Sequence, residues 1–385
     1  MVQVVTTKSW GSRIVGAFAG ILFGIALIIG SFVLVFWNEG HGLHTAQSLE
    51  QADKVLVSVP NAPVNPANDM KVVYFSGQAT TKDQLSDPLF HVSVNAINLQ
   101  RHVEMYQWQE NSSTQTQDQT GGGQTQTTTY TYQQVWSDHV IDSSNFKEPD
   151  GHQNPTSMPI SSQIQYAQTV TVGGYNLPSD LIQQITGSTP IDLSNTNLEL
   201  LKTKLNKPIQ HNGDGLYVGT NPDVPAIGDL KMSLTEVLPQ VVSIIAQQNN
   251  NTVQAYAAPA GETVMLLEMG QQSPDAMIQH ALSQNQMLTW ILRGVALLLM
   301  IIGLALLMQP MVVLADFFPF FGSIVGVGTG LIAFAGGLML WSMATAIAWF
   351  TIRPLWAIGL IVIAVLIGTT LIHRRKLKQV PKSAV

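Results

Sequence analysis

The run IVGAFAGILFGIALIIGSFVLVF, residues 14–36, decides the fold class of this chain, because it carries no charged side chain over 23 residues. A helix needs roughly 20 apolar residues to cross the hydrocarbon core of a bilayer. The apolar core of a cleaved signal peptide is only about 7–15 residues long. We therefore predict an uncleaved membrane anchor, with Trp37 at the interface, where indole rings concentrate.

Three further apolar runs crowd the C-terminal part of the chain, and a long polar segment, 37–287, separates them from the first. We predict transmembrane helices at 288–308, 324–350 and 355–371. The stretch 309–323 is too short and too interrupted by Asp316 and Pro319 to span, so we predict an interfacial segment there.

Basic residues in the two short tails predict how the chain is threaded. The tail 372–385 holds five Lys and Arg residues, and the tail 1–13 holds Lys8 and Arg13 without any acid. Short basic flanks stay in the cytoplasm. Both tails are therefore expected to be cytoplasmic, which requires an even number of spans and places 37–287 on the opposite side.

The charge balance of the polar segment differs from that of the rest of the chain. Residues 37–286 carry 9 basic and 23 acidic side chains, a net charge of −14, whereas the remainder carries 9 basic and 1 acidic, a net charge of +8. An acidic domain does not suit nucleic acid, so no nucleic-acid partner is predicted. The absence of cysteine excludes a disulfide framework and thiolate catalysis.

Alternation with a period of two dominates the polar segment, as in KVVYFSG at 71–77 and FHVSVNAI at 90–97. A helix start at Ser273-Pro274-Asp275 precedes the second span. We predict an α+β fold: a four-span helical membrane protein with a large, strand-dominated extracytoplasmic domain between the first and second spans.

The clearest strand pair is RHVEMYQW at 101–108 with YTYQQVWSDHVI at 130–141. The tract between them is nearly all Gln, Thr, Ser and Gly. Such a composition cannot bury a core, so we predict a long β-hairpin with a flexible tip at 110–129.

The first strand of this hairpin carries the best candidate site. Alternation places Arg101 on one face and His102, Glu104, Tyr106 and Trp108 on the other. His102 and Glu104 could reach a metal together with Asp138 or His139 of the partner strand. The alternative, which we favour, is a cross-strand ladder of polar and aromatic side chains without a ligand. We predict no catalytic residue, no metal and no cofactor, because no GxSxG, HExxH or GxxxxGK[ST] motif is present.

Glycines repeat at four-residue spacing in two of the spans, at Gly16, Gly20 and Gly24, and at Gly322, Gly326 and Gly330. Small residues at this spacing line one helix face and let another helix approach closely. They predict tight helix packing, either within one chain or between chains.

Several motifs, taken in order, resemble the LUMA, or transmembrane protein 43, family. They are NEGHGLHTAQSL (38–49), LSDP (85–88), LQRHVEMYQW (99–108), NPTSM (154–158), PAIGDLKMSL (225–234), WILRG (290–294) and RPLWA (353–357). The resemblance implies one N-terminal span, a large lumenal-type domain, three C-terminal spans and no established catalytic residue. It also implies an organiser that self-associates and binds other membrane and envelope proteins in the endoplasmic reticulum and inner nuclear membrane.

The Gln-rich, cysteine-free character of the chain suggests a bacterial member, with the domain in the periplasm and the spans in the inner membrane. We predict a non-enzymatic, multi-pass membrane scaffold that forms a homo-oligomer and contacts membrane lipids and other membrane or envelope proteins. Two alternatives stay open: a channel or transport component acting as an oligomer, and an envelope enzyme acting on lipid or glycan.

Overall fold

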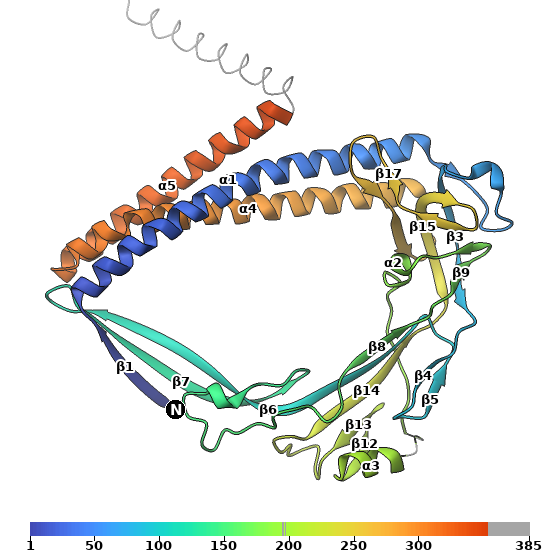
Figure 1. Cartoon of the computed structure of the whole chain (residues 1–385), viewed down its shortest axis with the longest axis horizontal. Helices are drawn as coiled ribbons and strands as arrows, with labels where there is room; N and C mark the ends of the chain where they lie inside the picture. Colours follow the sequence, from blue (N-terminus) through green and yellow to red (C-terminus); the bar gives the residue numbers. More distant parts are fainter. Residues whose placement is uncertain (195, 197, 353–385) are drawn as a thin grey trace, which may run out of the picture. The chain divides into compact units, whose positions relative to one another are not determined.

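The computed structural model describes residues 1–352 except 195 and 197, and it contains two compact units (Figure 1). The strand-rich unit comprises 1–6, 48–116 and 126–281, and the described part of the helical unit comprises 7–47, 117–125 and 282–352. The predicted fourth span, 355–371, and the basic tail, 372–385, lie outside the described residues.

Two large sheets organise the strand-rich unit. The first has the order β1 (Val2–Lys8), β7 (Gln124–Ser137), β6 (Asn98–Asp118), β14 (Leu230–Val237), β13 (Gly215–Val218), β12 (Ile209–Asn212), with β11 (Thr189–Pro190) on β14 and β8 (Gln163–Tyr166) on β6. The second has the order β19 (Leu266–Met269), β15 (Gln240–Asn249), β16 (Thr252–Gln254), β10 (Tyr175–Asn176), β9 (Val170–Val172), β3 (Val72–Thr81), β2 (Val57–Ser58).

Smaller elements complete the unit. These are the hairpins β4 (Leu85–Asp87) with β5 (Val92–Val94) and β17 (Tyr256–Ala257) with β18 (Thr263–Val264), the helices α2 (Ser179–Ile182) and α3 (Glu199–Leu205), and the 3-10 turns η1 (Pro66–Asn68) and η2 (Ser143–Asn145). The predicted α+β class with a strand-rich central domain is confirmed.

Each large sheet buries its own hydrophobic cluster. In the second sheet Phe75 of β3 and Tyr175 of β10 are fully buried and stack with ring centroids 4.2 Å apart. In the first sheet Val103 and Met105 of β6 face the buried side, together with Leu230 of β14. Alternate positions of each strand therefore supply the core, as the period of two requires.

The hairpin continues through the tract for which the sequence predicts a flexible tip. β6 runs to Asp118 and β7 begins at Gln124, so most of 110–129 is strand. Threonine favours strands, and the hydroxyls of Thr114 and Thr128 lie 2.9 Å apart across the pair. The connecting turn places Gly121 and Gly122 at φ values of +90° and +78°, where glycine carries no steric penalty.

Residues 1–13 are a strand and the start of a helix, where the sequence analysis expects a cytoplasmic tail. β1 pairs with β7 at the edge of the first sheet. The β-branched run VQVVTTK is typical of a strand, whereas Lys8 and Arg13 are typical of a cytoplasmic tail, so the two local signals compete. Residues 2–8 are therefore an edge strand of the first sheet, an element that the sequence analysis does not predict.

Three long helices form most of the helical unit: α1 (Trp10–Val55), α4 (Pro274–Ala315) and α5 (Pro319–Ile352). All three are long and apolar enough to cross a membrane. The predicted spans 14–36, 288–308 and 324–350 lie inside them. The segment 309–323, predicted to be interfacial, comprises the end of α4, a short turn at 316–318 and the start of α5 at Pro319, a residue suited to the first helical position.

Candidate functional site

The strand RHVEMYQW sits at the centre of the first sheet, where its inward side chains tie distant segments together. Arg101 is buried and donates to Asp87 Oδ2 at 2.7 Å and to the Ser161 carbonyl at 3.0 Å. The backbone N–H of Trp108 donates to Asn154 Oδ1 at 2.7 Å. Asp87 belongs to LSDP and Asn154 to NPTSM, so three of the motifs are in contact.

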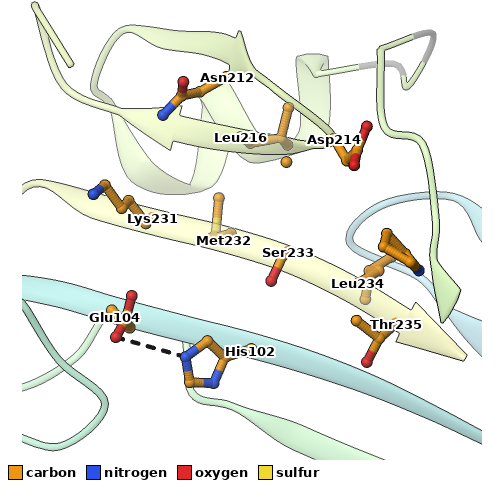
Figure 2. Close-up of a pocket in the computed structure, with 12 residues that line it drawn as sticks. His102, Glu104, Asn212, Asp214, Leu216, Lys231, Met232, Ser233, Leu234 and Thr235 are labelled. Atoms are coloured by element: carbon orange, nitrogen blue, oxygen red, sulfur yellow. Dashed lines mark ion pairs between the residues drawn. The ribbon is translucent and has the colours of Figure 1, made fainter. Parts of the chain in front are cut away.

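The outward side chains of the same strand line a shallow cavity of about 370 Å³ (Figure 2). His102 Nε2 lies 3.7 Å from Glu104 Oε1. The register sets Ser233 of β14 opposite His102 and Lys231 opposite Glu104. The cavity therefore combines both signs of charge with hydroxyl groups, without a cluster of a single sign.

The metal hypothesis lacks a third ligand in this arrangement. His139 Nδ1 and Asp138 Oδ1 lie 2.8 Å apart, and this hydrogen bond lowers the pKa of the exposed Asp138 carboxyl. Across the described range no three His, Cys, Asp or Glu side chains gather closely enough to hold a metal ion. His102 and Glu104 lie on the same strand, β6, and their cross-strand neighbours on β14 are Ser233 and Lys231.

Aromatic side chains of β6, β7 and β13 lie close to one another beside this strand. The Tyr106 and Trp136 ring centroids lie 5.0 Å apart, and those of Trp136 and Tyr217 lie 6.2 Å apart. Lys231 Nζ sits 4.3 Å above the Trp136 ring. Tyr217 donates to Asp229 Oδ2 at 2.6 Å, and burial followed by this hydrogen bond raises the pKa of the Tyr217 phenol.

Trp108 is half-buried and packs at a T-shaped angle on His152, with ring centroids 4.8 Å apart. Together with the hydrogen bond between Trp108 and Asn154, this contact holds β6 in place where the β6–β7 hairpin extends beyond Trp108. The family-motif strand, Arg101 to Trp108, is therefore held by structural contacts on both faces.

The glycines of α1 differ sharply in their surroundings. A Cβ added at Gly24 would lie 2.7 Å from the Gly303 carbonyl of α4, so the two helices are in backbone contact there. At Gly20 the nearest atom would be Leu306 Cδ2 at 3.9 Å, and at Gly16 no atom lies within 4 Å. Among the described residues, close packing against α1 therefore involves Gly24 and neither Gly16 nor Gly20.

The glycines of α5 show the same gradient. Gly322 lies against Asp316, Gly326 meets only Val312 at 3.6 Å, and Gly330 has no atom within 4 Å. The close approach on α5 occurs at Gly337, where a Cβ would lie 3.1 Å from Ile301 Cα. Sequence reasoning missed Gly303 and Gly337 because neither belongs to a four-residue repeat.

A buried ion pair joins α1 and α4 at one end of the apolar stretch. Arg293 Nε and Nη2 donate to Glu39 Oε1 and Oε2 at 2.6 and 2.7 Å, and Trp349 Nε1 of α5 donates to Glu39 Oε2 at 2.8 Å. Glu39 lies in the motif NEGHGL and Arg293 in the motif WILRG. Their presence in family motifs is the sequence signal that could have indicated this ion pair.

A second ion pair closes the other end of the helical unit. Arg13 pairs with Asp316, and it donates to the Gly122 carbonyl of the hairpin turn at 2.7 Å. Trp10 Nε1 donates to the Val313 carbonyl at 2.8 Å. Positions 13 and 39 of α1 are about 39 Å apart at 1.5 Å per residue. This length exceeds the roughly 30 Å thickness of the hydrocarbon core of a bilayer.

An apolar bundle with charged side chains confined to its two ends, joined to a strand-rich unit, defines an integral membrane protein of the α+β class. The chain belongs to the transmembrane protein 43 family, whose model, described as Transmembrane protein 43, matches residues 105–354.

Full-length relatives support the assignment. Transmembrane protein 43 of Homo sapiens is 32% identical over 396 residues, covering 98% of this chain and 96% of the relative. That of Pongo abelii is 32% identical over 389 residues, covering 97% and 93%. The Transmembrane protein 43 homolog of Drosophila melanogaster is 27% identical over 295 residues, covering 73% and 74%. No solved structure matches this chain significantly.

Proposed function

We propose that this protein is a non-enzymatic membrane scaffold that self-associates through its helices and binds other membrane or envelope proteins through its strand-rich domain. The supporting observation is that, among the described residues up to 352, nothing packs against two of the predicted packing glycines. Gly16 and Gly330 have no atom within 4 Å of a Cβ built on them.

Large apolar side chains beside these glycines are also exposed, including Val15 next to Gly16 and Leu331 next to Gly330. Lipid tails are as apolar as such side chains, so exposure alone does not favour association. A glycine face can favour association, because it lets a second helix backbone approach closely enough for extensive van der Waals contact. Contacts between chains are therefore assigned to Gly16 and Gly330, and contacts within the chain to Gly24.

Mass photometry of the purified full chain in detergent tests the proposal. Gly16→Leu and Gly330→Leu should each give a smaller particle while the unfolding temperature stays unchanged. Gly24→Leu is the matched control, because it should lower the unfolding temperature through a clash with the Gly303 carbonyl. A wild-type protein that is monomeric at micromolar concentration would contradict self-association.

The proposed arrangement places the 37–287 domain outside the cytoplasm and the 372–385 tail inside it. The net charge of −14 on the domain and the basic residues of that tail support it. In a bacterium the domain would be periplasmic, and in a eukaryote it would lie in the lumen of the endoplasmic reticulum or nuclear envelope. The pairing of β1 with β7 supports placing residues 2–8 on the same side as the domain.

A further inference from the structure

A polar cavity of about 360 Å³ lies beside the Glu39–Arg293 ion pair in the helical unit. Gly42 of α1, Asn285 and Thr289 of α4, and Trp349 of α5 contribute to its wall. The volume falls within the range of about 300–1,000 Å³ typical of small-ligand sites. A buried charge pair gives this cavity a chemistry that the surrounding apolar helix surfaces lack.

The unused hydrogen-bonding capacity at the ion pair consists of donors. Both oxygens of Glu39 already accept from Arg293, and Trp349 adds a third bond. Within the part of the chain that the structure describes, Arg293 Nη1 and the Trp290 indole N–H have no acceptor. A ligand that satisfies them must supply oxygen acceptors, and a phosphate group is the strongest such partner of a guanidinium.

The net charge of the cavity favours a zwitterionic phosphate head group over an anionic one. Glu39 neutralises Arg293, so the cavity has no net positive charge to balance an anionic ligand. A head group that carries its own cation avoids this imbalance. The Trp290 ring, 4.6 Å from the Arg293 guanidinium carbon and largely exposed, also offers a face on which an ammonium group could rest.

Among the described residues, apolar side chains near the cavity-lining positions of α4 and α5 are exposed. Exposed side chains on the same helices are Met287, Leu288, Ile291 and Phe350. Tryptophan and arginine at the end of an apolar helix are typical of the membrane interface. The occupant therefore needs a polar head at the cavity and hydrocarbon beside it, which is the form of a membrane phospholipid.

We propose that this cavity binds the head group of a zwitterionic phospholipid, with the phosphodiester accepting hydrogen bonds from Arg293 Nη1 and Trp290 Nε1. The acyl chains then lie along the exposed apolar surface of α4 and α5. This proposal is independent of the scaffold role, because it concerns a site on one chain.

Native mass spectrometry of the delipidated full chain, titrated with dioleoylphosphatidylethanolamine, tests the site. Wild type should bind one lipid in preference to further adducts. Trp290→Phe removes the indole donor and should weaken that first binding step about fivefold, and Arg293→Lys, which keeps the charge beside Glu39, should weaken it about tenfold. Melting curves establish that each variant is folded.

Trp37→Phe is the matched control. Trp37 is an exposed tryptophan of α1 that stacks on His41, with ring centroids 5.0 Å apart, and it does not line the cavity. Its replacement should leave the first binding step unchanged. Equal affinities for Trp290→Phe and Trp37→Phe would overturn the proposal even if Arg293→Lys failed to fold.

Two competitors separate the sources of phosphate. Dioleoylphosphatidylglycerol, which is anionic, should bind more weakly at the first step, and inorganic phosphate should not displace the lipid. Tighter binding of the anionic lipid, or displacement by millimolar phosphate, would overturn the assignment to a zwitterionic head group.

Discussion

The strand-rich unit and the helical unit place the same kinds of side chain in opposite environments. Phe75 of β3 is 0% exposed, whereas Phe18 of α1 is 57% exposed. Only 17% of the most apolar window of each long helix is buried. The hydrophobic effect drives apolar side chains out of water but not out of hydrocarbon. The strand-rich unit is therefore suited to water and the helical unit to lipid.

Charged side chains follow the complementary rule. The strand-rich unit exposes most of its charges and buries Arg101 only with its partner Asp87. The helical unit confines Arg13 and Asp316 to one end of the bundle and Glu39 with Arg293 to the other. An unpaired charge is costly in a medium without water, so pairing at the ends is the arrangement a membrane permits.

The largest expected effect concerns β1, the segment that joins the two units along the chain. Because β1 pairs with β7, a membrane-impermeant maleimide should label Thr6→Cys to the same extent as Ser93→Cys in the domain. Ser383→Cys, in the basic tail, should stay unlabelled in intact cells. The chain has no native cysteine, so no background must be removed. Labelling of Thr6→Cys like the tail would show that α1 crosses the membrane and that β1 is unpaired.

The next effect measures burial directly. Phe75→Ala should lower the free energy of unfolding of the strand-rich unit by about 3–5 kcal/mol, because it opens a cavity beside Tyr175. Phe18→Ala should change the unfolding temperature little, since lipid or detergent fills the space. Thermal unfolding of both variants in the same detergent checks the pair. Equal decreases in the unfolding temperature for the two variants would contradict the proposed difference in environment between the two units.

A smaller effect is expected at the end of the helical unit. Arg13→Gln leaves the buried Asp316 without its ion-pair partner and removes a bond to the hairpin turn, which should destabilise the unit by about 2–3 kcal/mol. Arg13→Gln combined with Asp316→Asn should recover part of the loss. No recovery in the double variant would mean that the hairpin-turn contact, and not the charge pair, stabilises this end.

The smallest effect concerns Glu236 on β14. Burial raises the pKa of its carboxyl above the ordinary value of 4.5. Between 4.5 and the raised pKa the folded protein binds more protons than the unfolded chain, so this contribution to stability falls as pH rises through that window. Glu236→Gln should therefore be slightly more stable than wild type at neutral pH and equal to it near pH 4. Chemical unfolding at the two pH values measures the difference, and a larger advantage at acid pH would reverse the sign.

The length and periodicity of short sequence stretches predicted the apolar helices and the strands of the central domain. The 23-residue uncharged run, the alternation in RHVEMYQW and the placement of Arg101 opposite His102 all follow from periodicity and length. Composition misled at the hairpin turn, where a Gln- and Thr-rich tract forms paired strands because cross-strand hydrogen bonds replace a hydrophobic core. The strand β1 was overlooked for a different reason, because its basic neighbours gave a competing signal.

The sequence by itself determined the apolar helices, the strand-rich domain between the first and the second, and the membership of residues in family motifs. Only the tertiary structure decided which motifs meet: Glu39 with Arg293, Arg101 with Asp87, and Gly24 with Gly303. The spacing of apolar and polar residues along the chain indicates both the type of secondary structure and which side chains are buried, so these features can be predicted from a short stretch of sequence. Partners separated by more than 250 positions, as Glu39 and Arg293 are, leave no local periodicity, so folding alone brings them together.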